Sequence, residues 1–107
     1  MTNKLSISIV IPVFNEEESL NRLYNELTQV LEQFVSWEII FVDDGSDDNS
    51  YPVLKKLVDE DSRVVAIRFY RNFGKADALS EGFKHTRGNI IITMDADLQD
   101  DPAEIPN

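Results

Sequence analysis

Four short apolar runs, separated by three segments with helical periodicity, constrain the fold of this chain more than any other feature. The runs are rich in β-branched residues and are bounded by polar or glycine-containing turns, which is typical of buried strands. They cover residues 5–13, 37–42, 64–69 and 89–94. Strict alternation of strands and helices predicts a Rossmann-like α/β fold in the order β-α-β-α-β-α-β, with a mostly parallel sheet and right-handed crossovers.

The segments between these runs carry apolar residues at spacings of three and four, which predicts amphipathic helices. We expect these helices at residues 16–34, 50–59 and 75–86. Asn15 is the expected N-cap of the first helix, with Glu18 closing a capping box. In the third helix, Ala76, Leu79 and Phe83 are expected to face inward.

The composition indicates a single globular domain that covers residues 1–107. Hydrophobic residues make up 42% of the 107 residues, which is ample for a core and argues against disorder. The formal net charge of −10 makes nucleic acid an unsuitable partner, because binding a phosphate backbone needs clustered Lys and Arg. Cysteine is absent, so the sequence excludes disulfides and thiolate metal sites.

Neither a signal-peptide pattern nor an apolar run of about 20 residues is found in the sequence. We therefore expect a soluble, cytoplasmic chain. Residues 102–107 have the pattern of a helix start with nothing following it. For this reason we expect the chain to be a piece of a longer protein.

Each predicted strand is followed by a polar segment, and these four segments are the main functional signal. They are residues 12–16, 43–46, 71–75 and 95–99. In parallel sheets, ligands bind beyond the carboxyl ends of the strands. We therefore expect the four segments to lie along one rim of the sheet.

The acidic segment after the last strand indicates a cation site. Asp95 and Asp97 are two positions apart in an extended segment and should share a face, with Gln99 next in line. Two unit charges about 5 Å apart, at an effective dielectric of about 20, repel by roughly 3 kcal/mol. A hard divalent ion with oxygen ligands would remove that repulsion. Taken alone, such a pair is more often a solvated acidic turn.

The first two segments each have a binding interpretation and a structural one. Pro12 and Phe14 could flank a flat base, with Glu16 accepting from a ribose hydroxyl or a base N–H, but acids also suit the first turn of a helix. Asp44 could accept the imide N–H of uracil or the equivalent N–H of guanine. The alternative is an ordinary turn, with Gly45 at positive φ.

The third segment places Arg71, Gly74 and Lys75 at the start of a helix, where an anion such as a diphosphate is favoured. It is not a Walker loop, because the spacing of that motif is absent. The single histidine, His85, is expected near a helix C-terminus in an ordinary surface role.

Together the four segments resemble the amino-terminal half of the inverting family 2 glycosyltransferases, which have the GT-A fold. The resemblance covers essentially the whole chain and rests on four blocks in the order of the family: PVFNEEESL, VDDGSDDNS, RNFGKADAL and DADLQDDPAEIP. The RNFGK and DLQDDP forms are most similar to the branch that moves a sugar from a nucleotide onto a polyprenyl phosphate, as in dolichyl- or undecaprenyl-phosphate sugar transferases.

The resemblance implies a set of site residues. The nucleotide pocket would be lined by Pro12, Phe14, Glu16, Val42 and Asp44. Asp95, Ala96 and Asp97 would lie along the ribose and diphosphate, and Asp97 and Gln99, with Asp95 beside them, would hold Mg²⁺ or Mn²⁺. Lys75 or Arg71 would assist the leaving diphosphate. Two positions depart from the commoner family forms, which have Tyr in place of Phe14 and Pro in place of Asp101.

The implied activity is transfer of a sugar from a UDP- or GDP-sugar to a polyprenyl phosphate, or to a saccharide hydroxyl. The catalytic base and the acceptor half would follow Asn107, and the full-length protein would act at the cytoplasmic face of the membrane. We therefore expect the chain alone to be inactive and prone to self-association. The alternatives are a non-catalytic nucleotide-binding module, a phosphoacceptor signalling domain, which would carry its acid pair after the first strand, and a nucleotidyltransferase, which would need a glycine-rich loop there.

Overall fold

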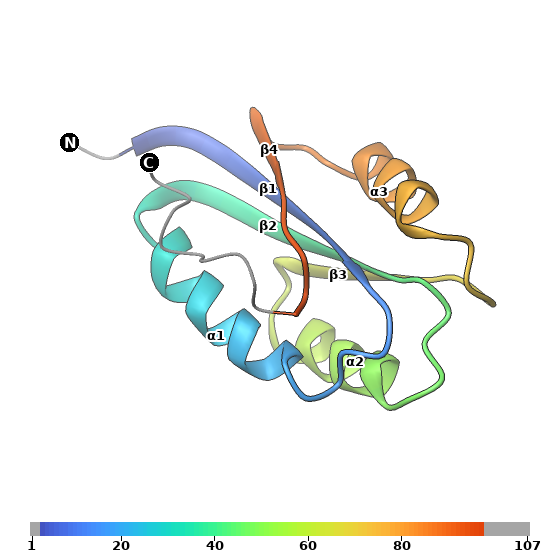
Figure 1. The fold of residues 1–107 in the computed structure, drawn as a ribbon. Helices are drawn as coiled ribbons and strands as arrows, with labels where there is room; N and C mark the ends of the chain where they lie inside the picture. The colour runs from blue at the N-terminus through green and yellow to red at the C-terminus, as the bar shows by residue number, and fades with distance from the viewer. Residues whose placement is uncertain (1–2, 98–107) are drawn as a thin grey trace.

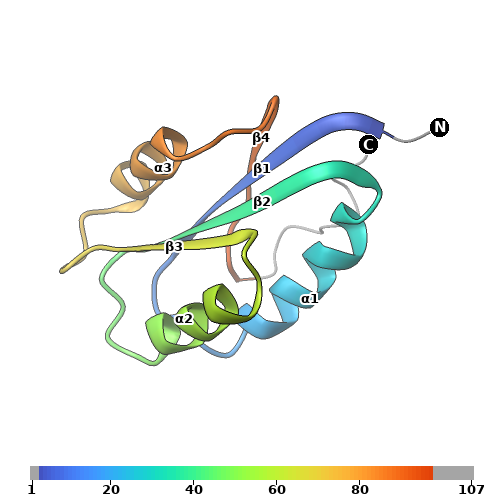
Figure 2. The ribbon, with the colours of Figure 1, turned by 180° about the vertical axis from the view of Figure 1, so that it is seen from behind.

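The computed structural model of the protein describes residues 3–97, which form a four-stranded sheet with helices on both faces (Figures 1 and 2). The strands are β1 (Asn3–Val13), β2 (Phe34–Asp43), β3 (Val64–Arg68) and β4 (Ile90–Thr93). The helices are α1 (Leu20–Leu31), α2 (Ser50–Glu60) and α3 (Lys75–Lys84). All described strand pairs are parallel, in the order β3-β2-β1-β4, which confirms the predicted α/β class.

The central position of β1 and β2 sets where the functional segments lie. β1 pairs with β2 up to Val13 opposite Asp43, and β2 pairs with β3 up to Arg68. On its other side β1 pairs with β4, with Val10 opposite Thr93. Because the strands are parallel, their carboxyl ends and the segments that follow them meet at one edge of the sheet.

The two central strands are buried on both faces, as a covered parallel sheet requires. One face packs against α1 and α2 in the larger core, which includes Ile9, Ile39 and Phe41. The apolar stripe of α1 consists of leucines at 20, 23, 27 and 31, all fully buried. The opposite face packs against α3 through a smaller cluster of Ile40, Val42 and Ala78. Burial of each large apolar side chain contributes about 1.5–3 kcal/mol.

The first helix begins later than the sequence indicated, and the predicted capping box is wrong. α1 starts at Leu20, with Ser19 at the N-cap position and no side-chain capping hydrogen bond. Asn15 has a φ of 54°, a left-handed conformation that Asn tolerates better than most residues. Its side chain contacts the loop after β2, so tertiary hydrogen bonds override the local capping signal.

The face of α3 that packs on the sheet also differs from the prediction. Ala76 and Phe83 are exposed, and Ala78 and Gly82 face the sheet instead. A Cβ added at Gly82 would lie 2.4 Å from the Val10 Cγ1 atom, so the helix approaches too closely for a larger side chain there. Small residues four positions apart therefore determine the orientation of α3.

Part of the surface near α3 and β4 is apolar. Phe83, Ile90 and Ile91 are exposed, and within residues 3–97 β4 is paired on one side only. Exposed apolar residues at a sheet edge favour association, and self-association of the chain stays a prediction. None of the helices described here is long and apolar enough to cross a membrane.

A polar cluster fastens α1 to the segment between α2 and β3. The Tyr24 hydroxyl donates to Asp61 Oδ2 at 2.6 Å, and the Arg63 guanidinium donates to the same carboxylate while lying 3.8 Å from the centre of the Trp37 ring. Hydrogen bonding by Arg63, aided by Tyr24 and opposed by burial, lowers the pKa of Asp61 to about 2. Burial and the bond to Asp61 raise the pKa of Tyr24 to about 12.

We expect this cluster to make stability depend on acid. The folded-state pKa of Asp61 lies below its unfolded value of about 3.9, so its contribution is complete above about pH 4 and is lost as pH falls towards 2. Because Arg63 is half exposed, Asp61→Asn should lower the free energy of unfolding by only about 1–2 kcal/mol at pH 7. Urea unfolding at pH 7, 4 and 2 measures this difference, with Asp59→Asn at an exposed site as the control. A difference that does not shrink below pH 4 would contradict the assignment.

Candidate functional site

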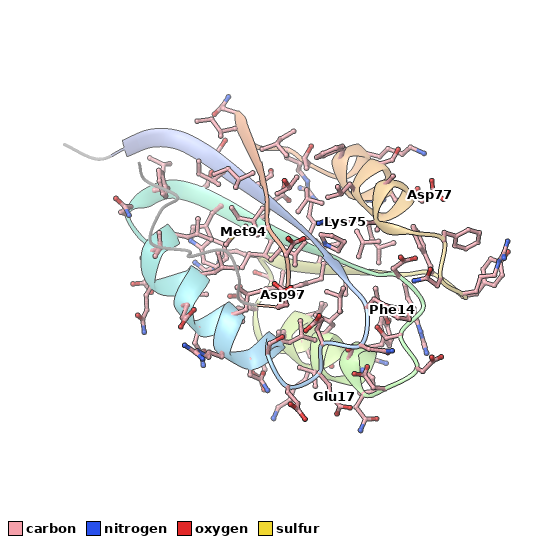
Figure 3. The ribbon with its side chains drawn as sticks, viewed as in Figure 1. Phe14, Glu17, Lys75, Asp77, Met94 and Asp97 are labelled. Carbon is pink, nitrogen blue, oxygen red and sulfur yellow. The ribbon has the colours of Figure 1, made fainter. Side chains whose placement is uncertain are left out.

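A hollow of about 240 Å³ lies at the carboxyl edge of the sheet. It is lined by Pro12, Val13, Phe14, Glu16, Asp44, Lys75, Asp95, Ala96 and Asp97. Figure 3 shows Phe14, Lys75 and Asp97 reaching this region from the loop after β1, the start of α3 and the turn after β4. All four segments that the sequence analysis placed on one rim therefore contribute to a single hollow.

Eight of the nine residues implied at a nucleotide-sugar site line this hollow, and Val42 is the exception. Val42 is fully buried and packs in the cluster beneath α3. This placement follows from strand alternation, because Val42 points to the face covered by α3. Gln99, implied as a metal ligand, and Asp101 lie outside the described residues.

The loop after β1 interlocks with the loop after β2. Asn15 Oδ1 accepts the Asp47 amide at 2.8 Å, and the Asn15 amide donates to Ser46 Oγ at 2.9 Å. The Glu16 amide donates to Ser50 Oγ at 2.9 Å. These bonds fix where Glu16 enters the hollow.

Two acidic residues of the second loop, Asp43 and Asp48, accept hydrogen bonds from backbone amides at this junction. The Ser50 amide donates to Asp48 Oδ1 at 2.9 Å, and the Glu17 amide donates to Asp48 Oδ2. Slight burial acts in the opposite direction, but hydrogen bonds from Ser50 and Glu17 lower the pKa of Asp48 below its usual range. Asp43 is fully buried, and its Oδ1 accepts the Ser46 amide at 3.0 Å. Asp43 and Asp48 thus hold the backbone of this loop in place.

Asp44 fastens the third segment to the second. Its Oδ1 accepts the Phe73 amide at 2.7 Å, and its Oδ2 accepts the Gly74 amide at 3.0 Å and the Asn72 side-chain amide at 3.1 Å. The residue is only 4% exposed but still lines the hollow. A carboxylate has about four acceptor positions, so Asp44 can hold the loop and also accept from a ligand.

Gly45 allows the third segment to lie directly on the second. Its φ is 74°, which confirms the positive φ predicted for the turn. A Cβ added here would lie 2.3 Å from the carbonyl carbon of Arg71, so any side chain would displace that loop. The Arg71 guanidinium lies 4.5 Å from the centre of the Phe73 ring and does not line the hollow, whereas Lys75 does.

The Asp95–Asp97 turn is anchored by its middle residue. Ala96 is 4% exposed and packs in the larger core, while Asp97 is exposed and Asp95 is half-buried. The Lys75 ammonium forms an ion pair with Asp95 Oδ1. The two carboxylates therefore lie at the surface of the hollow, on a turn whose middle residue, Ala96, is anchored in the core.

Ser19 is a site-associated residue that the sequence analysis did not identify. Its hydroxyl donates to the Ala96 carbonyl at 2.6 Å and joins the start of α1 to the acidic turn. The available signal was a serine directly before an apolar helical stripe, which predicts at most a local cap. A contact across 77 positions of sequence leaves no local pattern. His85 is exposed and lies 3.3 Å from Glu81, which confirms its surface role.

The donor chemistry of the hollow fits a divalent cation that is shared with a ligand. Residues 3–97 contain no group of three or more His, Cys, Asp or Glu that could hold a metal. Mg²⁺ and similar hard ions are commonly bound by one or two carboxylates together with substrate phosphates. Asp95 and Asp97 supply such oxygens, and Asp95 is also ion-paired with Lys75.

The charge of the hollow also points to a cation. Among residues 3–97, the hollow is lined by the carboxylates of Glu16, Asp44, Asp95 and Asp97 and by the ammonium of Lys75. A phosphate-bearing ligand would be repelled unless additional positive charge accompanied it.

We expect Asp44→Ala to release the loop formed by residues 72–74. Removing a charged acceptor from two backbone amides should speed hydrogen exchange at Phe73 and Gly74 by about tenfold or more. Exchange measured by NMR tests this, with Asp47→Ala as the control because the Asp47 side chain is exposed. Unchanged protection at both amides would refute the role of Asp44 in holding this loop.

Comparison with solved structures identifies the same fold in known glycosyltransferases. The mannosyltransferase PcManGT from Pyrobaculum calidifontis, in complex with GDP-Man and Mn²⁺, matches with a TM-score of 0.78 and 20% identity, over 90% of this chain and 28% of that one. TarS from S. aureus in complex with UDP-GlcNAc matches with a TM-score of 0.73 and 22% identity, over 86% of this chain and 26% of that one. At these identities the likeness shows the fold, which is the amino-terminal part of GT-A.

Comparison with curated proteins finds closer relatives. The undecaprenyl-phosphate 4-deoxy-4-formamido-L-arabinose transferases of Salmonella paratyphi B and Salmonella newport are each 46% identical over 102 residues. The match covers 94% of this chain but only 31% of each relative. The family model described as Glycosyl transferase family 2 matches residues 8–107.

Proposed function

The chain belongs to glycosyl transferase family 2, and we propose that it forms the nucleotide-sugar-binding part of an enzyme that transfers a sugar from a UDP- or GDP-sugar to a polyprenyl phosphate. The observation that carries the proposal is the convergence of four strand-end segments on one acidic hollow. The 46% identity to transferases named for undecaprenyl phosphate supports the acceptor class.

The base would bind at the end of the hollow formed by the first two segments. Pro12 and the 43% exposed Phe14 present apolar faces on which a flat base can stack. Asp44 and Glu16 supply the acceptors for the N–H of uracil or guanine and for ribose hydroxyls. A base without that N–H would lose a charge-assisted hydrogen bond and would therefore bind less tightly.

The diphosphate would lie along Asp95, Ala96 and Asp97. Asp97 and Asp95, with Gln99 beyond them in sequence, would hold Mg²⁺ or Mn²⁺, and PcManGT was solved with Mn²⁺ beside GDP-Man. When bound, a divalent ion acts as a Lewis acid that stabilises the negative charge developing on the leaving diphosphate. Lys75 adds an ammonium at the same place, because it begins α3 beside Asp95.

A polyprenyl phosphate acceptor matches this chemistry well. Its phosphate is already anionic, so it can attack the anomeric carbon with little help from a general base. A saccharide hydroxyl would need such a base. With a lipid acceptor, the whole protein would act at the cytoplasmic face of a membrane, where the nucleotide sugar and the lipid phosphate meet.

We expect the chain to bind UDP or GDP more tightly with Mn²⁺ than with EDTA. Asp97→Ala should lower the affinity measured with Mn²⁺ by about tenfold or more, since charge-assisted contacts contribute about 1.5–3 kcal/mol. Isothermal titration calorimetry with both nucleotides measures this, and Asp59→Ala is the matched control at an exposed helical site. Preference for one nucleotide would identify the base.

Equal affinity with Mn²⁺ and with EDTA would remove the metal from the proposal. No binding of either nucleotide by the folded chain would overturn the donor assignment.

A further inference from the structure

The Ser19 hydroxyl is in an unusual place for a residue at the start of a helix. Ser19 occupies the N-cap position of α1, yet its side chain makes no capping hydrogen bond. The hydroxyl instead donates to the carbonyl of Ala96, the central residue of the acidic turn, at 2.6 Å. We propose that Ser19 is a positioning residue that orients the Asp95–Asp97 turn for metal-dependent binding of the nucleoside diphosphate. This inference rests on the proposed function.

The hydroxyl proton can serve only one acceptor fully at a time. The Glu16 carbonyl and the Glu16 Oε2 atom lie 3.2 and 3.3 Å from Ser19 Oγ, whereas the Ala96 carbonyl lies at 2.6 Å. The shortest contact therefore takes the proton. Ser19 thus stands between Glu16, at the base end of the hollow, and Ala96, at its diphosphate end.

The backbone that carries this hydroxyl is held by hydrogen bonds on both sides. The Ser19 amide donates to the Glu16 carbonyl at 3.1 Å, and the Ser19 carbonyl accepts the Leu23 amide at 2.9 Å. Leu20 and Leu23 beside it are fully buried. Ser19 therefore presents its hydroxyl from the rigid end of a packed helix.

The acidic turn is attached to the sheet and to the core near its start. The Met94 amide donates to the Val10 carbonyl at 3.2 Å, and the Ala96 side chain is buried. The carbonyl of Ala96 belongs to the peptide that leads into Asp97. Holding that carbonyl fixes the plane of the peptide and hence the position of the Asp97 Cα atom, from which the side chain extends.

The test compares three variants by calorimetry with UDP and GDP, in Mn²⁺ and in EDTA. Ser19→Ala should lower the Mn²⁺-dependent affinity by about three- to tenfold, the effect of one lost hydrogen bond, and leave the EDTA affinity unchanged. Ser19→Thr keeps a hydroxyl at the same carbon and should restore at least half of the loss. Thr28→Ala is the matched control, since Thr28 is also on α1 and donates to the Asn25 carbonyl away from the hollow.

The outcomes separate this inference from the proposed function. If the unaltered chain gains no affinity from Mn²⁺, the metal-dependent proposal fails and the role of Ser19 fails with it. If the unaltered chain responds to Mn²⁺ and Ser19→Ala responds equally, only the role of Ser19 is refuted. Equal loss in Mn²⁺ and in EDTA, or no recovery in Ser19→Thr, would also refute it, since either result indicates a general effect on the fold.

Discussion

The parallel pairing of β1 with its two neighbours is the constraint on which the rest of the structure depends. It aligns Val13 with Asp43 and places the loops after these strands side by side. Because β4 also runs parallel to β1, the acidic turn comes to the same edge. The loops then hydrogen-bond to one another through Asn15 and Asp44, which holds the lining segments together at this edge.

The electrostatics of the site depend on the hydrogen bonds and ion pairs that its carboxylates make within the protein. Asp44 accepts backbone and side-chain N–H groups, and Asp95 is paired with Lys75. These contacts stabilise a concentration of negative charge that would otherwise oppose folding. They leave the hollow acidic overall, and this is why a diphosphate donor is expected to arrive together with a divalent cation.

Features of the fold that depend on one local sequence pattern were predicted correctly. Features that depend on contacts between distant parts of the chain were not. The apolar runs predicted the four strands seen in residues 3–97 and their parallel pairing, and a glycine after an acid pair predicted the positive φ of Gly45. The start of α1 was misplaced because Asn15 bonds to another loop rather than capping its own helix. The packing face of α3 depends on close approach at Gly82, and the contact made by Ser19 crosses most of the chain. Neither has a signature in local periodicity.

The central claim is that the four strand-end segments form one site for a nucleoside diphosphate and a divalent cation. Paramagnetic broadening of backbone amide resonances by trace Mn²⁺ tests this most directly. With UDP or GDP present, broadening should centre on Asp95–Asp97 and Lys75, and should spare Trp37 and Gly88, which line a separate hollow. Broadening centred on the acidic loop at residues 15–18, or a pattern that is the same with and without nucleotide, would contradict the account.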